Sequence, residues 1–216
     1  MHFVDAWTSL PPYDSLLLLL PPLLVLVTAV LPGRVVARAA SLAIGALMLV
    51  VPELGPAALR LAWAAVWGAV ALLSASGGEA ERRDEPRPGT LESGVVGLLL
   101  ASVLFAILVV ALGREDLPAQ ATRRGSLGLL LMAAGLAHLM LRRDALRATT
   151  SFAALGLGLQ WIERAAREAA LEGSGAPEGA VPLATAIVVM LAARAAAVRQ
   201  RDAGSAWVSH AHDLHD

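Results

Sequence analysis

The sequence predicts an all-α integral membrane protein built as a bundle of about seven transmembrane helices. Seven apolar runs fill most of the 216 residues, and 57% of the residues are hydrophobic. Charged residues make up only 16%, well below the roughly 25% of a soluble globular domain. None of the runs carries an acidic residue near its middle, as expected of helices that cross the hydrocarbon core of a membrane, which takes about 20 residues.

Composition also excludes several kinds of chemistry. The chain has no cysteine, which rules out disulfides, thiolate zinc sites and iron–sulfur clusters held by its own thiolates. The net charge of -1 and the lack of a basic patch give no sign of a nucleic-acid partner. We therefore expect no resident cofactor and no nucleic acid, with the lipid bilayer as the surroundings of most of the chain.

The chain begins with an N-terminal segment, residues 1–14, followed by the Leu-rich run 15–32. The segment has no basic region, and no small-residue cleavage site follows the run, so we interpret the run as a retained span rather than a signal peptide. Pro21 and Pro22 lie inside it and are expected to kink it, because each removes a backbone donor. If this run does not span, six helices remain and the N-terminus moves to the cytoplasmic side.

The second and third runs, residues 35–51 and 57–76, complete an N-terminal group of helices over 15–76. Pro52 ends the second run, and a Gly-Gly pair ends the third. Residues 77–93 are a polar linker, too rich in charge and proline for a helix core.

The second group of helices covers residues 94–198. Its four apolar runs are 94–112, 125–141, 146–162 and 180–198. Charged, Gly-containing stretches at 113–124 and 163–179 are interpreted as loops. Residues 199–216 are predicted to form a polar cytoplasmic tail. Ala154 and Gly158 are spaced by four, which favours close helix packing in the sixth run.

Arginine placement predicts the orientation. With seven spans, one side of the membrane holds Arg34, Arg38, Arg82, Arg83, Arg87, Arg142, Arg143, Arg147, Arg194, Arg199 and Arg201. The other side holds Arg60, Arg114, Arg123, Arg124, Arg164 and Arg167. The positive-inside rule then places the N-terminus outside and the C-terminus in the cytoplasm of a bacterial inner membrane.

Three polar residues near the apolar runs are candidates for a proton path or a partner interface. Glu53 follows Pro52 in the turn between two runs, where it is either a loop charge or a lateral proton entry. His138 lies near the end of its run and could relay protons, although packing is the commoner role of such a histidine. Gln160 could hydrogen-bond across helices, next to Trp161, which fits an interfacial aromatic belt.

The remaining aromatic and histidine residues suggest no site. Trp63 and Trp67 share one helix face and are expected to pack or to face lipid. The tail contains metal-ligand residue types in His210, His212, Asp213, His215 and Asp216. Because the segment is terminal and no further ligands accompany it, we interpret it as a solvated or partner-docked tail. We expect neither a catalytic nor a metal site.

A basic turn and the run that follows it resemble a known family. Residues 142–147 read Arg-Arg-Asp-Ala-Leu-Arg between two spans, and residues 182–194 read Pro-Leu-Ala-Thr-Ala-Ile-Val-Val-Met-Leu-Ala-Ala-Arg. Over residues 125–205, and most closely over the NuoK-like region 125–198, the chain resembles the hydrogenase-4 component E family, whose members are related to the NuoK-type subunit of complex I. Arg143, Arg147, Gly158 and Arg194 match the pattern of that family.

The chain departs from the family where protons would be handled. In the family, a Met-Glu-Asn-Gly segment lies in the sixth span, and the resemblance implies that its glutamate transfers protons. Counting from Arg143 and Arg147, that position is Gly156, and Pro182 or Leu183 replaces the acid of the seventh span. Only Gly158 of the segment is retained.

The resemblance implies a non-catalytic membrane subunit of a complex I-like or group 4 hydrogenase-like respiratory assembly. Such a subunit would pack against antiporter-like subunits and lack its own proton-transfer carboxylate, although it could complete a neighbour's proton path. It would have no catalytic activity of its own within an oxidoreductase complex. The alternative is a stand-alone multi-pass transporter or channel, against which the lack of charge within the membrane argues.

Overall fold

The computed structural model describes residues 3–31, 33–75, 102–103, 106, 117–141, 147–169, 177 and 179–203. Within these residues the protein is entirely helical, with no strand. The elements are α1 (Phe3–Thr8), α2 (Pro12–Val30), α3 (Arg34–Val50), the 3₁₀ turn η1 (Pro52–Leu54), α4 (Ala57–Ala75), α6 (Ala119–Leu141), α7 (Ala148–Glu168) and α8 (Ala180–Ala203).

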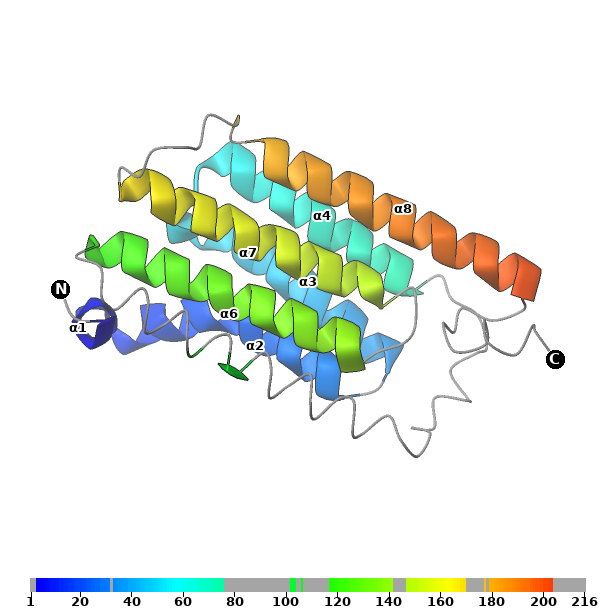
Figure 1. Ribbon diagram of the computed structural model, residues 1–216, viewed down its shortest axis with the longest axis horizontal. Helices are drawn as coiled ribbons and strands as arrows, with labels where there is room; N and C mark the ends of the chain where they lie inside the picture. The colour runs from blue at the N-terminus through cyan, green and yellow to red at the C-terminus, as the bar shows by residue number, and fades with distance from the viewer. Residues whose placement is uncertain are drawn as a thin grey trace.

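The long helices lie side by side along one direction (Figure 1). Helices α2, α4, α6 and α8 run one way, and α3 and α7 run the other. We call the end where α1 lies, and where α2, α4, α6 and α8 begin, the α1 end. We call the opposite end, where α3 and α7 begin, the far end. Because α4 finishes at the far end and α6 begins at the α1 end, the segment between them joins opposite ends.

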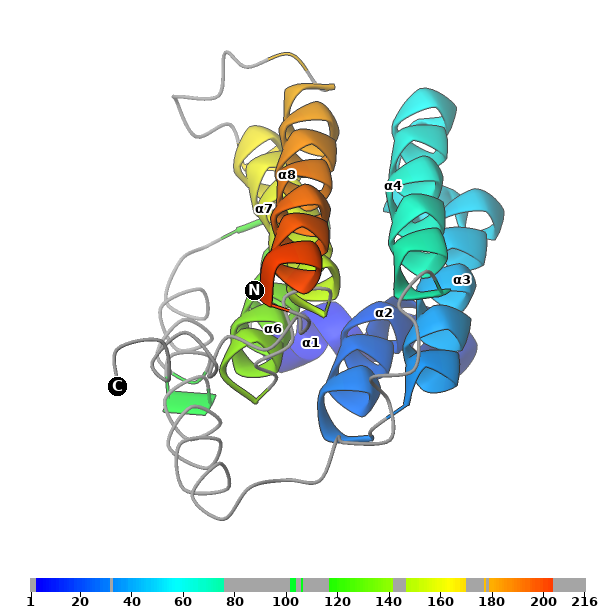
Figure 2. The same ribbon diagram turned by 90° about the vertical axis from the view of Figure 1, so that its right-hand side faces the viewer.

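Helices α3 and α4 form one pair, α6, α7 and α8 form a second group, and α2 joins the two groups along one side (Figure 2). The most extensive packing is between α6 and α7. Trp63 and Trp67 of α4, only 2% and 0% exposed, belong to the shared apolar core. Of the two roles expected for these tryptophans, the structure therefore shows packing.

Three helices are long and apolar enough to cross a membrane: α2, α4 and α8. The predicted seven spans are not reached in the described residues. With 17 residues, α3 extends about 25 Å, less than a hydrocarbon core of about 30 Å. Helices α6 and α7 carry charged turns at the α1 end, and of the predicted run 94–112 the structure describes only residues 102, 103 and 106, which are helical.

Several predicted boundaries are wrong. Helix α6 begins at Ala119 rather than 125, α7 continues to Glu168 rather than 162, and α8 continues to Ala203 rather than 198. In each case polar turns that were interpreted as loop or tail extend the helix. Helix α2 also begins earlier, at Pro12, and continues through Pro21 and Pro22, whose rings are buried.

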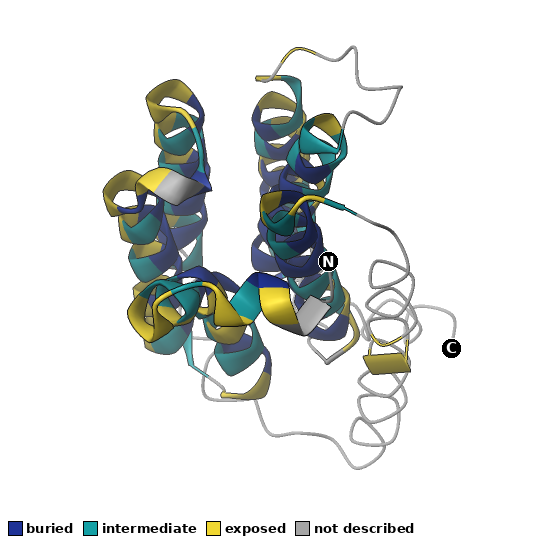
Figure 3. Cartoon of the chain, turned by 90° about the vertical axis from the view of Figure 1, so that its left-hand side faces the viewer, coloured by how far each residue is buried: buried dark blue, intermediate teal, exposed yellow. Residues whose placement is uncertain are grey.

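The distribution of polarity is that of a membrane protein. Large apolar side chains are exposed along the outer faces of α2, α3, α4 and α8, and buried positions face the interior (Figure 3). In the described part of the chain, the buried polar residues are Thr28, Ser41, Thr122, Ser126, His138, Arg147, Thr149, Thr150, Ser151, Gln160 and Thr185. In each of α2, α4 and α8, at most 33% of the apolar stretch is buried. Their outer faces are suited to lipid or to another membrane protein.

Candidate functional site

The contact between α6 and α7 depends on glycines. A Cβ atom added to Gly128 would lie 2.6 Å from the carbonyl oxygen of Gly158, and one added to Gly158 would lie 2.6 Å from that of Gly128. One to two turns along, Gly135 faces Ala154, whose Cβ would be 3.3 Å away. The predicted packing face of Ala154 and Gly158 is therefore confirmed, with α6 as its partner. The approach leaves no space between these backbones for a side chain or a path.

His138 lies inside this same interface. Its side chain is 1% exposed, and its Nδ1 is 2.8 Å from the hydroxyl oxygen of Ser151, which is 0% exposed. The hydrogen bond links α6 to α7 two turns from the glycine contact toward the far end. This arrangement gives His138 a role in joining the helices, and it identifies Ser151 as a partner that sequence reasoning did not find.

Gly156, where the family resemblance leads one to expect an acid, faces α8. A Cβ atom added there would collide with the side chain of Thr185, approaching its Oγ1 and lying 2.6 Å from its Cγ2. The Thr185 hydroxyl is occupied, since it donates to the carbonyl of Val181 on its own helix at 2.8 Å. A glutamate at position 156 would have no room unless α8 moved.

The last turns of α7 form a charged ladder at the α1 end. Gln160 does not bond across helices as predicted, because its Nε2 donates to Glu163 Oε2 on the same helix at 3.1 Å. Arg167 pairs with the other oxygen of Glu163 at 2.7 Å. Across the interface, Arg124 of α6 forms an ion pair with Glu168. These pairs explain why α7 continues past its apolar run.

Arg164 points to a different neighbour. Its guanidinium lies against Gly55, which has a φ of +143° in the turn that joins η1 to α4. The Arg164 Nη1 is buried and has no hydrogen-bond partner among the described residues. Glu53 lies in the same turn, but its side chain is outside the described part, so its predicted role stays a prediction.

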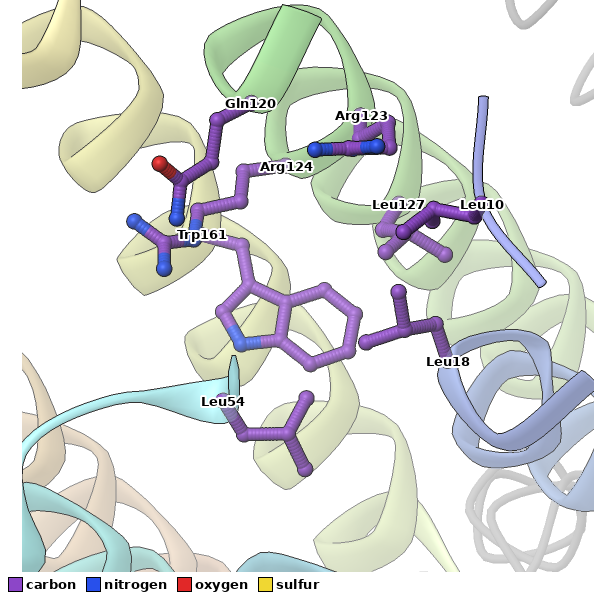
Figure 4. Close-up of a pocket in the computed structure, with 8 residues that line it drawn as sticks. All are labelled: Leu10, Leu18, Leu54, Gln120, Arg123, Arg124, Leu127 and Trp161. Atoms are coloured by element: carbon purple, nitrogen blue, oxygen red, sulfur yellow. The ribbon is translucent and has the colours of Figure 1, made fainter. Parts of the chain in front are cut away.

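A cavity of about 60 Å³ lies beside this charged ladder (Figure 4). Four elements and the α1–α2 junction meet at it, contributing Leu10, Leu18, Leu54, Gln120, Arg123, Arg124, Leu127 and Trp161. One side is apolar, and the other carries the amide of Gln120 and two guanidiniums. Trp161 lines this cavity and is only 3% exposed. It therefore faces the interior and does not form the interfacial aromatic belt that was predicted.

The electrostatics of the cavity are one-sided. Arg123 donates to the carbonyl of Ala6 at 3.2 Å and to Ser9 Oγ at 3.5 Å, both neutral groups of the α1 region. Arg124 precedes the apolar stretch of α6, outside the candidate spans. Burial, and then the charges of Arg164 and Arg123, lower the pKa of Arg124 to about 10, so it remains protonated at neutral pH.

The two ends of the bundle carry different sets of arginines. Helix direction places at the far end Arg34, Arg38, Arg147, Arg194, Arg199 and Arg201. It places at the α1 end Arg60, Arg123, Arg124, Arg164 and Arg167. This sorting matches the two sets expected from the sequence for every described arginine.

The positions named by the family resemblance are spread over α7, α8 and the turn before α7. Arg147 is buried at the start of α7, where its carbonyl accepts from the amide of Thr150 at 3.1 Å. Arg194 is exposed on α8. Arg143 and the histidine tail lie outside the described residues. In the part that is described, no group of three or more potential ligands could hold a metal.

Sequence reasoning missed the charged residues that line the cavity or belong to the charged ladder beside it. The Arg123-Arg124 doublet was assigned to a loop, and Arg164 and Glu168 to the next one. Their spacing held a signal, because Gln160, Arg164 and Glu168 recur every four residues and therefore share one helix face. Comparison with protein families, curated proteins and solved structures found no match.

Proposed function

We propose that the chain is a non-catalytic subunit of a multi-subunit membrane assembly, in which it packs against larger membrane proteins. The close packing of α6, α7 and α8 is the observation that carries this proposal. Gly128 and Gly158 close the contact between α6 and α7, and Gly156 and Thr185 close the contact between α7 and α8, so among the described residues neither contact leaves space for a path. A subunit of this kind supports its neighbours and does not conduct ions by itself.

The assembly we propose is complex I-like or group 4 hydrogenase-like, located in a bacterial inner membrane. This part of the proposal rests on the resemblance through Arg147, Gly158 and Arg194. It is supported by the tight fit at Gly156, because a chain that had lost the acid of its family would be free to close that position with α8. The partners we propose are antiporter-like membrane subunits.

We further propose that all seven apolar runs span the bilayer, including residues 94–112. The opposite placement of the end of α4 and the start of α6 supports one crossing between them. Helices α6 and α7, whose apolar stretches end in charge, expose few large apolar side chains, and α2, α3, α4 and α8 form the lipid-facing or partner-facing rim of the bundle.

The test is purification of the tagged full-length chain from its native membrane in mild detergent. We expect antiporter-like and hydrogenase-like or complex I-like subunits to be recovered with it in fixed proportion, and their genes to lie beside its own. If the chain is instead recovered alone and monodisperse, the subunit proposal fails, and the stand-alone transporter has to be considered.

A further inference from the structure

Helix α8 buries one side and exposes the other. It packs against α7 and α4. Its buried positions recur every three or four residues and are Pro182, Thr185, Val189, Ala193 and Ala196. The opposite side, which we call the α8 outer face, recurs at the same spacing and consists of the exposed residues Leu183, Ile187, Met190, Leu191, Arg194 and Val198. Only 28% of the apolar stretch of α8 is buried, so most of it meets surroundings other than this chain.

An arginine lies in the middle of this apolar face. Arg194 comes four residues after Met190 and four before Val198, so the three share one side of the helix. At a rise of about 1.5 Å per residue, it lies about 21 Å from Ala180, inside the candidate span Ala180–Arg201. A guanidinium that faces apolar surroundings is costly unless a group of opposite charge compensates it.

The described part of the chain supplies no acid near Arg194. The carboxylates whose side chains are described are Asp5, Asp14, Glu163 and Glu168, and all of them lie at the α1 end, in α1, the first turn of α2 and the last turns of α7. Arg194 lies in the half of α8 that is nearer the far end. A lipid headgroup is a poorer partner than for Arg201, because Arg194 is about 10 Å deeper along the helix.

Charge also selects among the molecules that could cover the α8 outer face. Two copies of the chain in one membrane share an orientation, so a two-fold contact through this face would bring both Arg194 side chains to the same depth, where they repel. Acyl chains suit the exposed face of α2 better, since its large side chains are Leu16, Leu19, Leu23 and Val30 and carry no charge. The complementary surface for the α8 outer face is a different apolar helix with an acid.

We propose that the α8 outer face binds a transmembrane helix of another subunit, and that Arg194 pairs there with an aspartate or glutamate of that helix. The inference rests on the proposed subunit role and names the surface through which that role is carried out. Apolar side chains supply the packing, and the ion pair fixes the depth and the choice of partner.

Photo-crosslinking in the native membrane tests the surface. The crosslinker p-benzoylphenylalanine replaces Met190, which is 68% exposed and one turn from Arg194, in the tagged full-length chain. Leu16 of α2, 60% exposed, is replaced in the matched control. After irradiation and purification, mass spectrometry identifies the adducts. We expect position 190 to link to an apolar helix of another membrane protein that contains an aspartate or glutamate, and position 16 to link to lipid.

Variants test the ion pair. Arg194→Leu should lower recovery of the linked partner about tenfold, and Arg194→Lys, which keeps the charge, should retain most of it. Arg38→Leu is the matched control, because Arg38 is also an exposed arginine of an apolar helix at the far end, so its loss removes the same charge from the same side. This variant should recover the partner like the original chain.

A charge exchange gives an independent measurement. Arg194→Glu should abolish recovery, and replacement of the acid identified in the partner helix by arginine should restore it. Thermal unfolding in detergent checks that the variants fold, which we expect because the α8 outer face makes no packing contact within the chain.

Other outcomes would overturn the inference. These are adducts of position 190 with lipid alone, with a second copy or within the same chain, and equal losses in the Arg194→Leu and Arg38→Leu chains. If the assembly is still recovered in those cases, the proposed function stands and only the surface is wrong. Recovery of the original chain alone would contradict both.

Discussion

At the scale of single residues, glycine decides how closely α6 and α7 can approach. Gly158→Ala should lower the free energy of unfolding by about 1–3 kcal/mol, because the new methyl group meets a backbone carbonyl that cannot rotate away. Gly68→Ala is the control, since a Cβ there has nothing within 4 Å, and α4 should gain up to about 1 kcal/mol. Thermal unfolding of both variants in detergent measures the difference. Equal melting temperatures would contradict the close packing.

Another effect at this scale is the hydrogen bond between His138 and Ser151. Ser151→Ala removes the hydroxyl that bonds to the buried Nδ1 of His138. The free energy of unfolding should fall by about 1–3 kcal/mol. Ser74→Ala is the matched control, because its hydroxyl donates to the Val70 carbonyl of its own helix and bonds to no second helix among the described residues. Chemical denaturation in detergent should show a small change there, within about 0.5 kcal/mol. A similar loss in both variants would mean that the bond to His138 contributes nothing specific.

The scaffold proposal makes a functional prediction for the same histidine. In the intact assembly, His138→Ala and Glu53→Ala should leave proton pumping largely unchanged, because neither residue belongs to a continuous path in the proposed role. Proton uptake or release by membrane vesicles measures this. Complete loss of pumping with normal assembly would show that this subunit carries protons.

At the scale of elements, ion pairs determine where α6 begins and where α7 ends. Arg124 and Glu168 should therefore be coupled energetically. Arg124→Gln and Glu168→Gln should each lower the free energy of unfolding. The loss in the double variant should be smaller than the sum of the two single losses by about 1 kcal/mol. Unfolding of the four proteins of this double-mutant cycle gives the coupling energy. A coupling energy near zero would mean that the charged turns are held by other contacts.

How much of the fold the sequence predicts also differs from element to element. The end of α3 is predicted within one residue, because Pro52 stops a helix by local backbone chemistry. The start of α6 and the end of α7 are missed by six residues each. Local composition describes these polar turns as loop, whereas ion pairs stabilise them as helix, one within α7 between Glu163 and Arg167 and one between helices from Arg124 to Glu168.

The candidate site shows the same limit. Ala154 and Gly158 could be identified as a packing face from their spacing alone, and the structure adds only the partner helix. The contact of Arg164 with Gly55 could not be predicted, because it joins positions more than a hundred residues apart. The contact of Thr185 with Gly156 could not be predicted either, because it depends on how α8 packs against α7. At position 156 the structure shows a close approach of Thr185 on α8, which leaves no room for a side chain.

At the scale of the whole molecule, the outer faces of the bundle are apolar. The interior is mainly an apolar core in which hydroxyls, an imidazole and an amide are also buried, while leucine, isoleucine and methionine face outward on α8 and α2. This arrangement needs an apolar medium or apolar partners around the rim. Together with the sorting of arginines between the two ends, it makes the orientation of the chain a property that can be measured.

The lack of cysteine makes that measurement simple, because any introduced thiol is unique. We expect Ser9→Cys at the α1 end to react with a membrane-impermeant maleimide in spheroplasts, where only the outer face of the inner membrane is accessible. Arg201→Cys, on the exposed last turns of α8 at the far end, should react only after lysis. The reason is that the far end carries more arginines than the α1 end, and the side richer in arginine usually faces the cytoplasm. Both residues are exposed, so each controls for the reactivity of the other. The reverse pattern would invert the orientation, and labelling of both in spheroplasts would mean that the chain does not separate its two ends across the membrane.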